Sequence, residues 1–192
     1  MSLQRYSLLF TCGAVLAATS PLVAQQQMEK AQPGLSAELQ KVKASLEKYQ
    51  DPMAAVRDGF LSTTACVGYS DGNMGIHFIN MGNVGPTVDP QKPQVLIYEP
   101  YGEKLQLVAA EWFVPLATGV KERPSLLGQP LDGPMDGHEP LMPKELTHYD
   151  LHVLLWKDNP AGTFAMVNST VDCGKYGYTF VHKEPAAAHV HK

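Results

Sequence analysis

Alternation of apolar and polar residues is clearest late in the chain, over residues 147–157, which read THYDLHVLLWK. In an extended strand, successive side chains point to opposite faces. One face would be wholly apolar and consists of Tyr149, Leu151, Val153 and Leu155. The other begins with ionisable groups and ends with large apolar ones: His148, Asp150, His152, Leu154 and Trp156. A face of this kind is typical of a pocket wall, so the pattern predicts a strand that carries a site.

Helical spacing occurs nearer the N-terminus. Leu39, Val42, Leu46 and Tyr49 recur every three or four residues after Ser36, which has the chemistry of an N-cap. Asp51 and Pro52 then provide a cap and a first helical residue for a second helix over residues 53–60. Apolar runs at 74–80, 94–99 and 105–114 predict strands, the last two joined by a tight turn as a hairpin.

This order of elements predicts an α+β fold, in which two N-terminal helices pack on a curved, mostly antiparallel sheet. Residues 115–147 are dense in proline and glycine, and we expect them to form a long loop over one face of the sheet. Strand alternation places Leu107, Ala109 and Phe113 on the same face as Glu111.

The 192-residue chain is long enough for one domain with a substantial core. Residues 1–24 have a basic start, an apolar stretch and a small residue before a polar run, which is typical of a secretory signal peptide. We expect a flexible leader at 25–35, one domain at 36–180 and a mobile, histidine-containing tail at 181–192. No transmembrane segment is predicted after signal cleavage, so the protein is expected to be secreted or periplasmic.

The formal net charge is −4, and cleavage of the signal would remove Arg5 and no acidic residue. A chain of this charge, without basic clusters, is not expected to bind nucleic acid. Cleavage would also leave two cysteines, Cys66 and Cys173. An even pair in an exported protein is most simply one disulfide. A thiolate metal site is the alternative, but neither cysteine has a neighbouring cysteine partner.

The predicted strand at 147–157 carries the main candidate site. His148, Asp150 and His152 alternate along one face at a spacing of roughly 7 Å, so two of them can share one metal ion, or Asp150 can orient a histidine. Imidazole together with carboxylate suits Zn, Cu or Fe as a divalent ion. The alternative is a polar sheet face on which these side chains bond to one another.

Three further residues belong to the candidate site. Glu111 stands alone in the apolar run LVAAEWFVP, and a buried carboxylate requires a cation or a salt-bridge partner. His77 and His138 are expected as further metal ligands beside His148 and His152, while Asp150 or Glu111 would act as base or ligand if the domain is an enzyme, which stays open here.

The two additional histidines stand in motifs of identical spacing, Met-x-x-His-x-x-x-Met, at 74–81 and 135–142. Thioether and imidazole together suit copper. Methionines that fill gaps in a core are the more common explanation of such a pattern.

Two other classes of function compete with the metal site. Tyr98, Trp112, Phe113 and Trp156 could line a metal-free pocket for a small apolar ligand. A structural or envelope-interaction module, with a hydrated ionisable row, is the third alternative. The oligomeric state is not predicted by the sequence.

Five short phrases in the sequence carry a resemblance. They are MGIHF at 74–78, GQP at 128–130, GHEP at 137–140, LHV at 151–153 and NPAG at 159–162. Together they resemble a group of exported bacterial proteins of unassigned function, over most of the mature chain. The resemblance implies an exported single domain and brings no activity with it.

Overall fold

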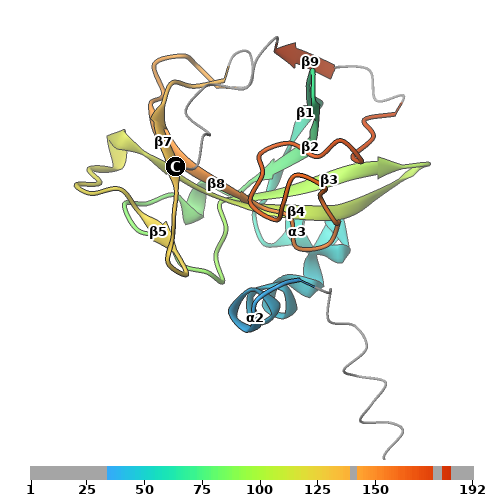
Figure 1. The fold of residues 1–192 in the computed structure, drawn as a ribbon, viewed down its shortest axis with the longest axis horizontal. Coiled ribbons are helices and arrows are strands. Elements are labelled where there is room, and N and C mark those ends of the chain that lie inside the picture. The colour runs from blue at the N-terminus through green and yellow to red at the C-terminus, as the bar shows by residue number, and fades with distance from the viewer. Residues whose placement is uncertain (1–33, 139–141, 175–178, 183–192) are drawn as a thin grey trace, which may run out of the picture. The chain divides into compact units, whose positions relative to one another are not determined.

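The computed structural model describes residues 34–138, 142–174 and 179–182 (Figure 1). The expected signal peptide at 1–24, residues 25–33 of the expected leader and residues 183–192 of the expected tail lie outside the described residues. Leu35, at the end of the expected leader, is buried in the main core. Within the described ranges, no helix is both long and apolar enough to cross a membrane.

The helical part begins where the sequence places a cap. Helix α2 (Ala37–Leu46) starts after Ser36, whose Oγ accepts a hydrogen bond from the Leu39 amide at 3.2 Å. A 3-10 turn, η1 (Glu47–Gln50), leads to the short helix α3 (Pro52–Arg57), which Asp51 caps through the Met53 amide. The apolar face of α2 is buried, so this part of the chain packs on the sheet.

Seven strands form one sheet in the order β7-β8-β4-β3-β2-β1-β9. Their bounds are β1 (Leu61–Tyr69), β2 (Gly72–Ile79), β3 (Val95–Tyr101), β4 (Lys104–Pro115), β7 (Asp132–Met135), β8 (His148–Val153) and β9 (Thr179–His182), with the 3-10 turn η2 (Met81–Asn83) after β2. All neighbours pair antiparallel except β1 and β9, which are parallel. The predicted α+β class with a mostly antiparallel sheet is confirmed.

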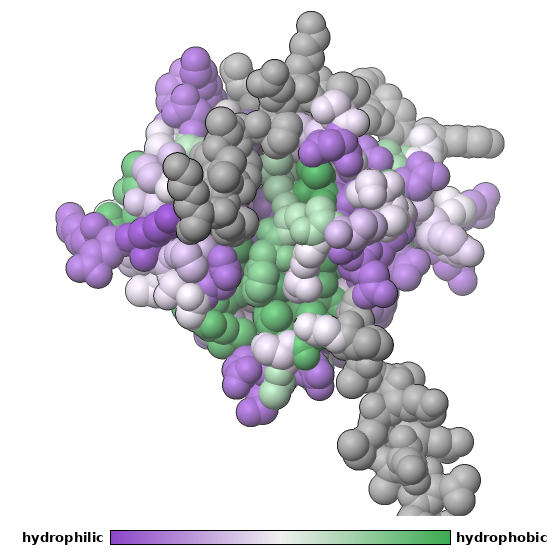
Figure 2. Space-filling view, in the orientation of Figure 1, coloured by the Kyte–Doolittle hydropathy of each residue, from purple (hydrophilic) through white to green (hydrophobic). Residues whose placement is uncertain are grey.

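The sheet is curved. In Figure 1, strands β7 and β8 rise on one side and β1 and β2 on the other, with β3 and β4 between them and α2 below. In the same orientation, Figure 2 shows hydrophobic residues gathered in the middle of the face in view, with hydrophilic residues to both sides. The helices therefore cover the outer side of the curve and leave its inner side for other segments.

Residues 115–147 are not the structureless loop that their proline and glycine content predicts. They contain the 3-10 turn η3 (Leu116–Thr118), the small hairpin of β5 (Ser125–Leu126) and β6 (Gln129–Pro130), and then β7. Strand β7 extends the main sheet beside β8, with Met135 opposite His148. Turn residues thus separate short strands in this segment. Composition alone did not distinguish such strands from a loop.

A bulge in β4 changes which of its residues share a face of the sheet. Ile97 pairs with Ala109 and the next residue of β3, Tyr98, pairs with Leu107, so Val108 has no partner across the ladder. The expectation that Leu107 shares the face of Glu111 is therefore wrong. Leu107 lies in the core between the sheet and the helices, whereas Val108 joins Ala109 on the inner face.

The predicted disulfide is confirmed between Cys66 of β1 and Cys173. It closes a loop of 107 residues and lies in the main core. Strand β9 follows and pairs with β1 as far as His182, so residues 181 and 182 of the expected tail belong to the sheet.

Candidate functional site

A cavity of about 260 Å³ opens on the inner face of the sheet. Its polar lining consists of Thr63, Tyr69, His77, Glu111, His138, Asp150 and His152. Most of the rest is apolar and includes Val67, Met74, Phe113, Met142 and Leu146. The segment after β7 contributes His138 and Met142, so residues predicted to lie over the sheet do reach this site.

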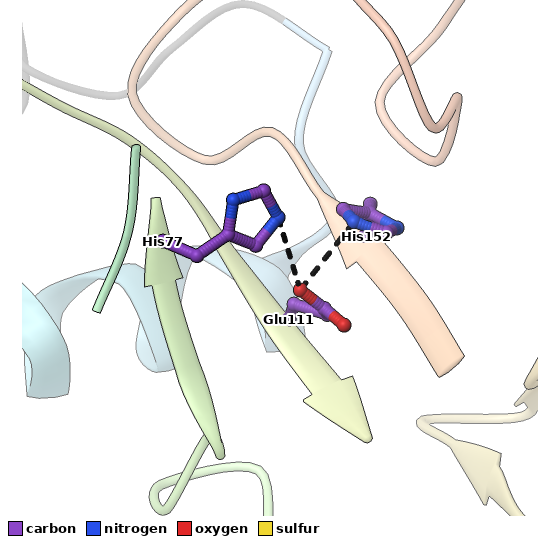
Figure 3. Close-up of side chains that lie close together, drawn as sticks. All are labelled: His77, Glu111 and His152. Atoms are coloured by element: carbon purple, nitrogen blue, oxygen red, sulfur yellow. Dashed lines mark ion pairs between the residues drawn. The ribbon is translucent and has the colours of Figure 1, made fainter. Parts of the chain in front are cut away.

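His77, Glu111 and His152 form the first of two groups of side chains in this region (Figure 3). They project toward one another from β2, β4 and β8, and both histidines face the same carboxylate oxygen. The distance from His152 Nε2 to Glu111 Oε2 is 3.4 Å, and from His77 Nε2 to the same oxygen 3.7 Å. Glu111 and His152 are only 2% and 4% exposed, so the group is shielded from solvent.

Sheet register explains how three distant residues meet. Glu111 lies directly opposite His152 in the β4–β8 ladder. His77 is two strands away from Glu111, across β3, where it lies opposite Ile97. All three side chains are on the inner face, because the alternation of each strand sends its apolar neighbours to the helix side.

His138, His148 and Asp150 form the second group. His148 Nε2 lies 3.6 Å from Asp150 Oδ2, and both residues are at most 2% exposed. The ring of His148 packs between those of Phe113 and His138, with centroid separations of 4.9 and 5.4 Å. The ionisable row of β8 is therefore buried, which removes the hydrated-surface premise of the structural-module alternative.

Distances within both groups fit a shared cation better than hydrogen bonds. An N–H···O bond normally spans about 2.7–3.2 Å, shorter than the 3.4, 3.6 and 3.7 Å separations seen here. Ligands that bind zinc tetrahedrally at about 2.0–2.2 Å are separated from one another by about 3.3–3.6 Å. Imidazole nitrogens and a carboxylate oxygen are also ligands that such ions prefer. The residues present thus fit a divalent metal ion.

Burial in and around the first group disfavours the charged forms of the ionisable side chains. Burial, with a smaller effect of nearby His152, lowers the pKa of His77 to about 3. Burial, and secondarily the Asp150 carboxylate, raises the pKa of Glu111 well above 4.5. The pKa of Tyr69 rises to about 12, chiefly through burial and then through Asp150 and Glu111. A bound cation would offset the cost of ionised Glu111 and needs the neutral imidazole that His77 already provides.

The six residues predicted as ligands or bases all lie in or beside one cavity, but not in the predicted arrangement. The sequence placed His148, Asp150 and His152 together as one floor. Instead, His152 joins Glu111 and His77, while His148 and Asp150 join His138. His152 lies opposite Glu111 in the β4–β8 ladder, whereas the rings of His148 and His138 are in contact.

Three of the four aromatic residues predicted for the pocket lie on the other side of the sheet. Tyr98 and Trp112 are in the core between the sheet and the helices. There Tyr98 Oη donates to the Tyr49 carbonyl and Trp112 Nε1 to the Asp89 carbonyl. Trp156 packs against the same core and donates to Glu47. Alternation continues past the end of β8, with Leu154 on the inner face and Leu155 in the core, and fails only at Trp156. Phe113 alone lines the cavity.

Further residues from three segments complete the wall of the cavity. Tyr69 and Val67 come from β1, which was not recognised as a strand. Met74, Met81 and Met142, from the two methionine–histidine motifs, all line the cavity. The repeated spacing was the signal that could have joined these segments.

No family model matches the chain, and searches of curated proteins and of solved structures gave no match either.

Proposed function

We propose that this protein is an exported metal-binding domain that holds a divalent ion, Zn, Cu or Fe, at His77, Glu111 and His152. The observation that carries the proposal is the convergence of two imidazoles on one buried carboxylate oxygen at 3.4 and 3.7 Å. Export is supported by the signal-like N-terminal sequence and by the disulfide.

A structural salt bridge is the main alternative role for Glu111. The cavity lining contains neither lysine nor arginine among the described residues. The cations closest to this carboxylate would have to be the two histidines, yet burial keeps His77 neutral at physiological pH. A neutral imidazole beside a carboxylate supports a ligand role, because metal ions require deprotonated nitrogen.

A metal held by three protein ligands keeps positions open for another molecule, and such an ion can activate bound water or oxygen. Asp150 lines the same cavity and would be the base that accepts a proton there. An activity on a small molecule would use these groups.

A second candidate function is suggested by the lining of the cavity, most of which is apolar. A metal-free pocket of about 260 Å³ could hold a small apolar molecule, since a cavity of about 150 Å³ already binds benzene. In that case the histidines would serve as hydrogen-bond donors.

Metal analysis of the protein purified without an affinity tag separates the two. All samples carry alanine at His189 and His191, so that the tail cannot capture metal. We expect stoichiometric Zn, Cu or Fe in this background and a loss of at least about a hundredfold in affinity in Glu111→Gln. Glu103→Gln, at an exposed carboxylate, is the matched control and should retain the metal. Equal retention in both variants would exclude the site.

A further inference from the structure

We propose a second metal site at His138, His148 and Asp150, so that the cavity holds two divalent ions side by side. The three donor atoms lie within 4.8 Å of one another, as do those of the first group. The inference goes beyond the single ion of the proposed function and can fail while that function stands.

The orientation of His148 supports this site independently. Its Nδ1 lies 2.9 Å from the carbonyl oxygen of Leu146 and donates its proton there, because a carbonyl can only accept. Nε2 then carries the lone pair, and this nitrogen faces Asp150. A histidine fixed by a backbone carbonyl through its other nitrogen is the usual arrangement of a metal ligand.

His148 is also fully buried, with 0% exposure, and its Nε2 makes no hydrogen bond. A buried nitrogen lone pair left without a donor costs its full desolvation free energy. Glu111 Oε2 presents the same feature in the first group. An ion at each position would satisfy both atoms.

The donor atoms form two groups. Those of His77, Glu111 and His152 lie within 4.8 Å of one another, as do those of His138, His148 and Asp150, and the two sets share no residue. Each set supplies two imidazoles and one carboxylate, which predicts the same class of ion at both.

The sites differ in how the chain builds them. All ligands of the first come from strands of the sheet, whereas His138 follows the end of β7. It is held by close backbone pairing: the Gly137 amide donates to the Lys144 carbonyl at 3.0 Å and the Met142 amide to the His138 carbonyl at 2.9 Å. A Cβ atom at Gly137 would clash with the Pro143 carbonyl oxygen, so only glycine permits this approach.

The test is a titration of the metal-free protein with Zn²⁺, with bound zinc counted by mass spectrometry after gel filtration, in the same His189→Ala and His191→Ala background. We expect two zinc ions per chain. His138→Ala removes a partly exposed ligand and should leave one. Gly137→Ala changes no ligand, yet should weaken the second ion at least tenfold by displacing His138.

Gly85→Ala is the matched control, because its Cβ would meet nothing within 4 Å, and it should keep both ions. His152→Ala should retain one ion, held at the second site. A chain that binds one ion, lost in His152→Ala but not in His138→Ala, overturns the second site and leaves the first.

One ion lost in both variants means a single shared centre, which also overturns the second site. Two ions that persist in both His138→Ala and Gly137→Ala do the same. A chain that binds no zinc, copper or iron at all refutes the proposed function as well.

Discussion

The two faces of the sheet are built from the same strands but are completed in opposite ways. On the helix face, Leu96, Trp112 and Leu151 are fully buried beneath α2 and α3 in one apolar core. On the inner face, the neighbouring residues Glu111 and His152 are buried just as deeply, although they are polar. Burial is therefore equal, and only the chemistry of the buried groups differs.

Polar atoms are satisfied on the helix face. Tyr98 Oη donates to a backbone carbonyl at 2.7 Å and Trp112 Nε1 to another at 2.8 Å. On the inner face, Glu111 Oε2 and His148 Nε2 have no hydrogen-bond partner. An unsatisfied buried polar group costs about 1–3 kcal/mol. The helix face therefore contributes stability, whereas the inner face carries the groups that could hold a metal ion.

The largest expected contrast comes from adjacent residues of β8. Leu151→Ala should lower the free energy of unfolding by about 3–5 kcal/mol, because it opens a cavity in the main core. His152→Ala should change the stability of the metal-free protein by less than about 1 kcal/mol, yet abolish metal binding at the first site. Denaturant unfolding of metal-free protein and metal analysis of folded protein measure both effects.

The same two variants also test whether a substitution on the helix face leaves metal binding unchanged. Folded Leu151→Ala should retain the metal content of the unmodified chain, since its side chain points away from the cavity. If Leu151→Ala lost metal as readily as His152→Ala while still folded, the two faces would not be separable.

A further effect on stability is expected from pH. The pKa of His77 is about 3 in the folded chain, below its ordinary value of 6.5. Between these values the unfolded chain binds one more proton than the folded chain, so stability rises with pH, by about 1.4 kcal/mol per pH unit. The stability contribution is complete above pH 6.5 and is lost as the pH falls toward 3.

His77→Phe should flatten this dependence in the metal-free protein, as followed by thermal unfolding between pH 3 and 7. The neighbouring groups whose charges shift the pKa of His77 are His152, His138 and Asp150, and Glu111 is in contact with it. Glu111 acts in the opposite sense above pH 4.5, because burial raises its pKa in the folded state. A Glu111→Gln background therefore isolates the effect of the histidine. If His77→Phe left the slope of stability against pH unchanged in that background, the result would contradict the burial of His77 as a neutral group.

Sequence periodicity predicted the helix face well, since apolar alternation in β4 and β8 and the Ser36 cap are local signals. It also identified every histidine and carboxylate of the described cavity lining, because an isolated acid or a row of histidines in an apolar strand is conspicuous. Which residues group together could not be predicted. That depends on the order β8-β4-β3-β2, which brings His77 across β3 to Glu111 and is a property of long-range pairing.

Two local irregularities account for the errors at Leu107 and Trp156. The bulge at Val108 moves Leu107 to the helix face, and the alternation that continues through Leu155 fails at Trp156, beyond the end of β8. A shift of one residue exchanges the faces of all that follows. Regular alternation therefore assigned Trp156 to the pocket.

Trp156→Phe gives the smallest expected effect and tests that reassignment directly. The indole Nε1 donates to Glu47 at 3.0 Å on the helix side, so its loss should lower the free energy of unfolding by about 1 kcal/mol. Zinc affinity should remain within a factor of about two, because the ring is absent from the cavity wall. Phe113→Leu is the contrasting variant: it keeps an apolar side chain in the cavity but removes the ring that packs on His148. It should weaken zinc binding at the second site, measured by the same titration. If Trp156→Phe reduced zinc affinity tenfold or more, this tryptophan would belong to the pocket after all, and the division between the two faces would fail at the end of β8.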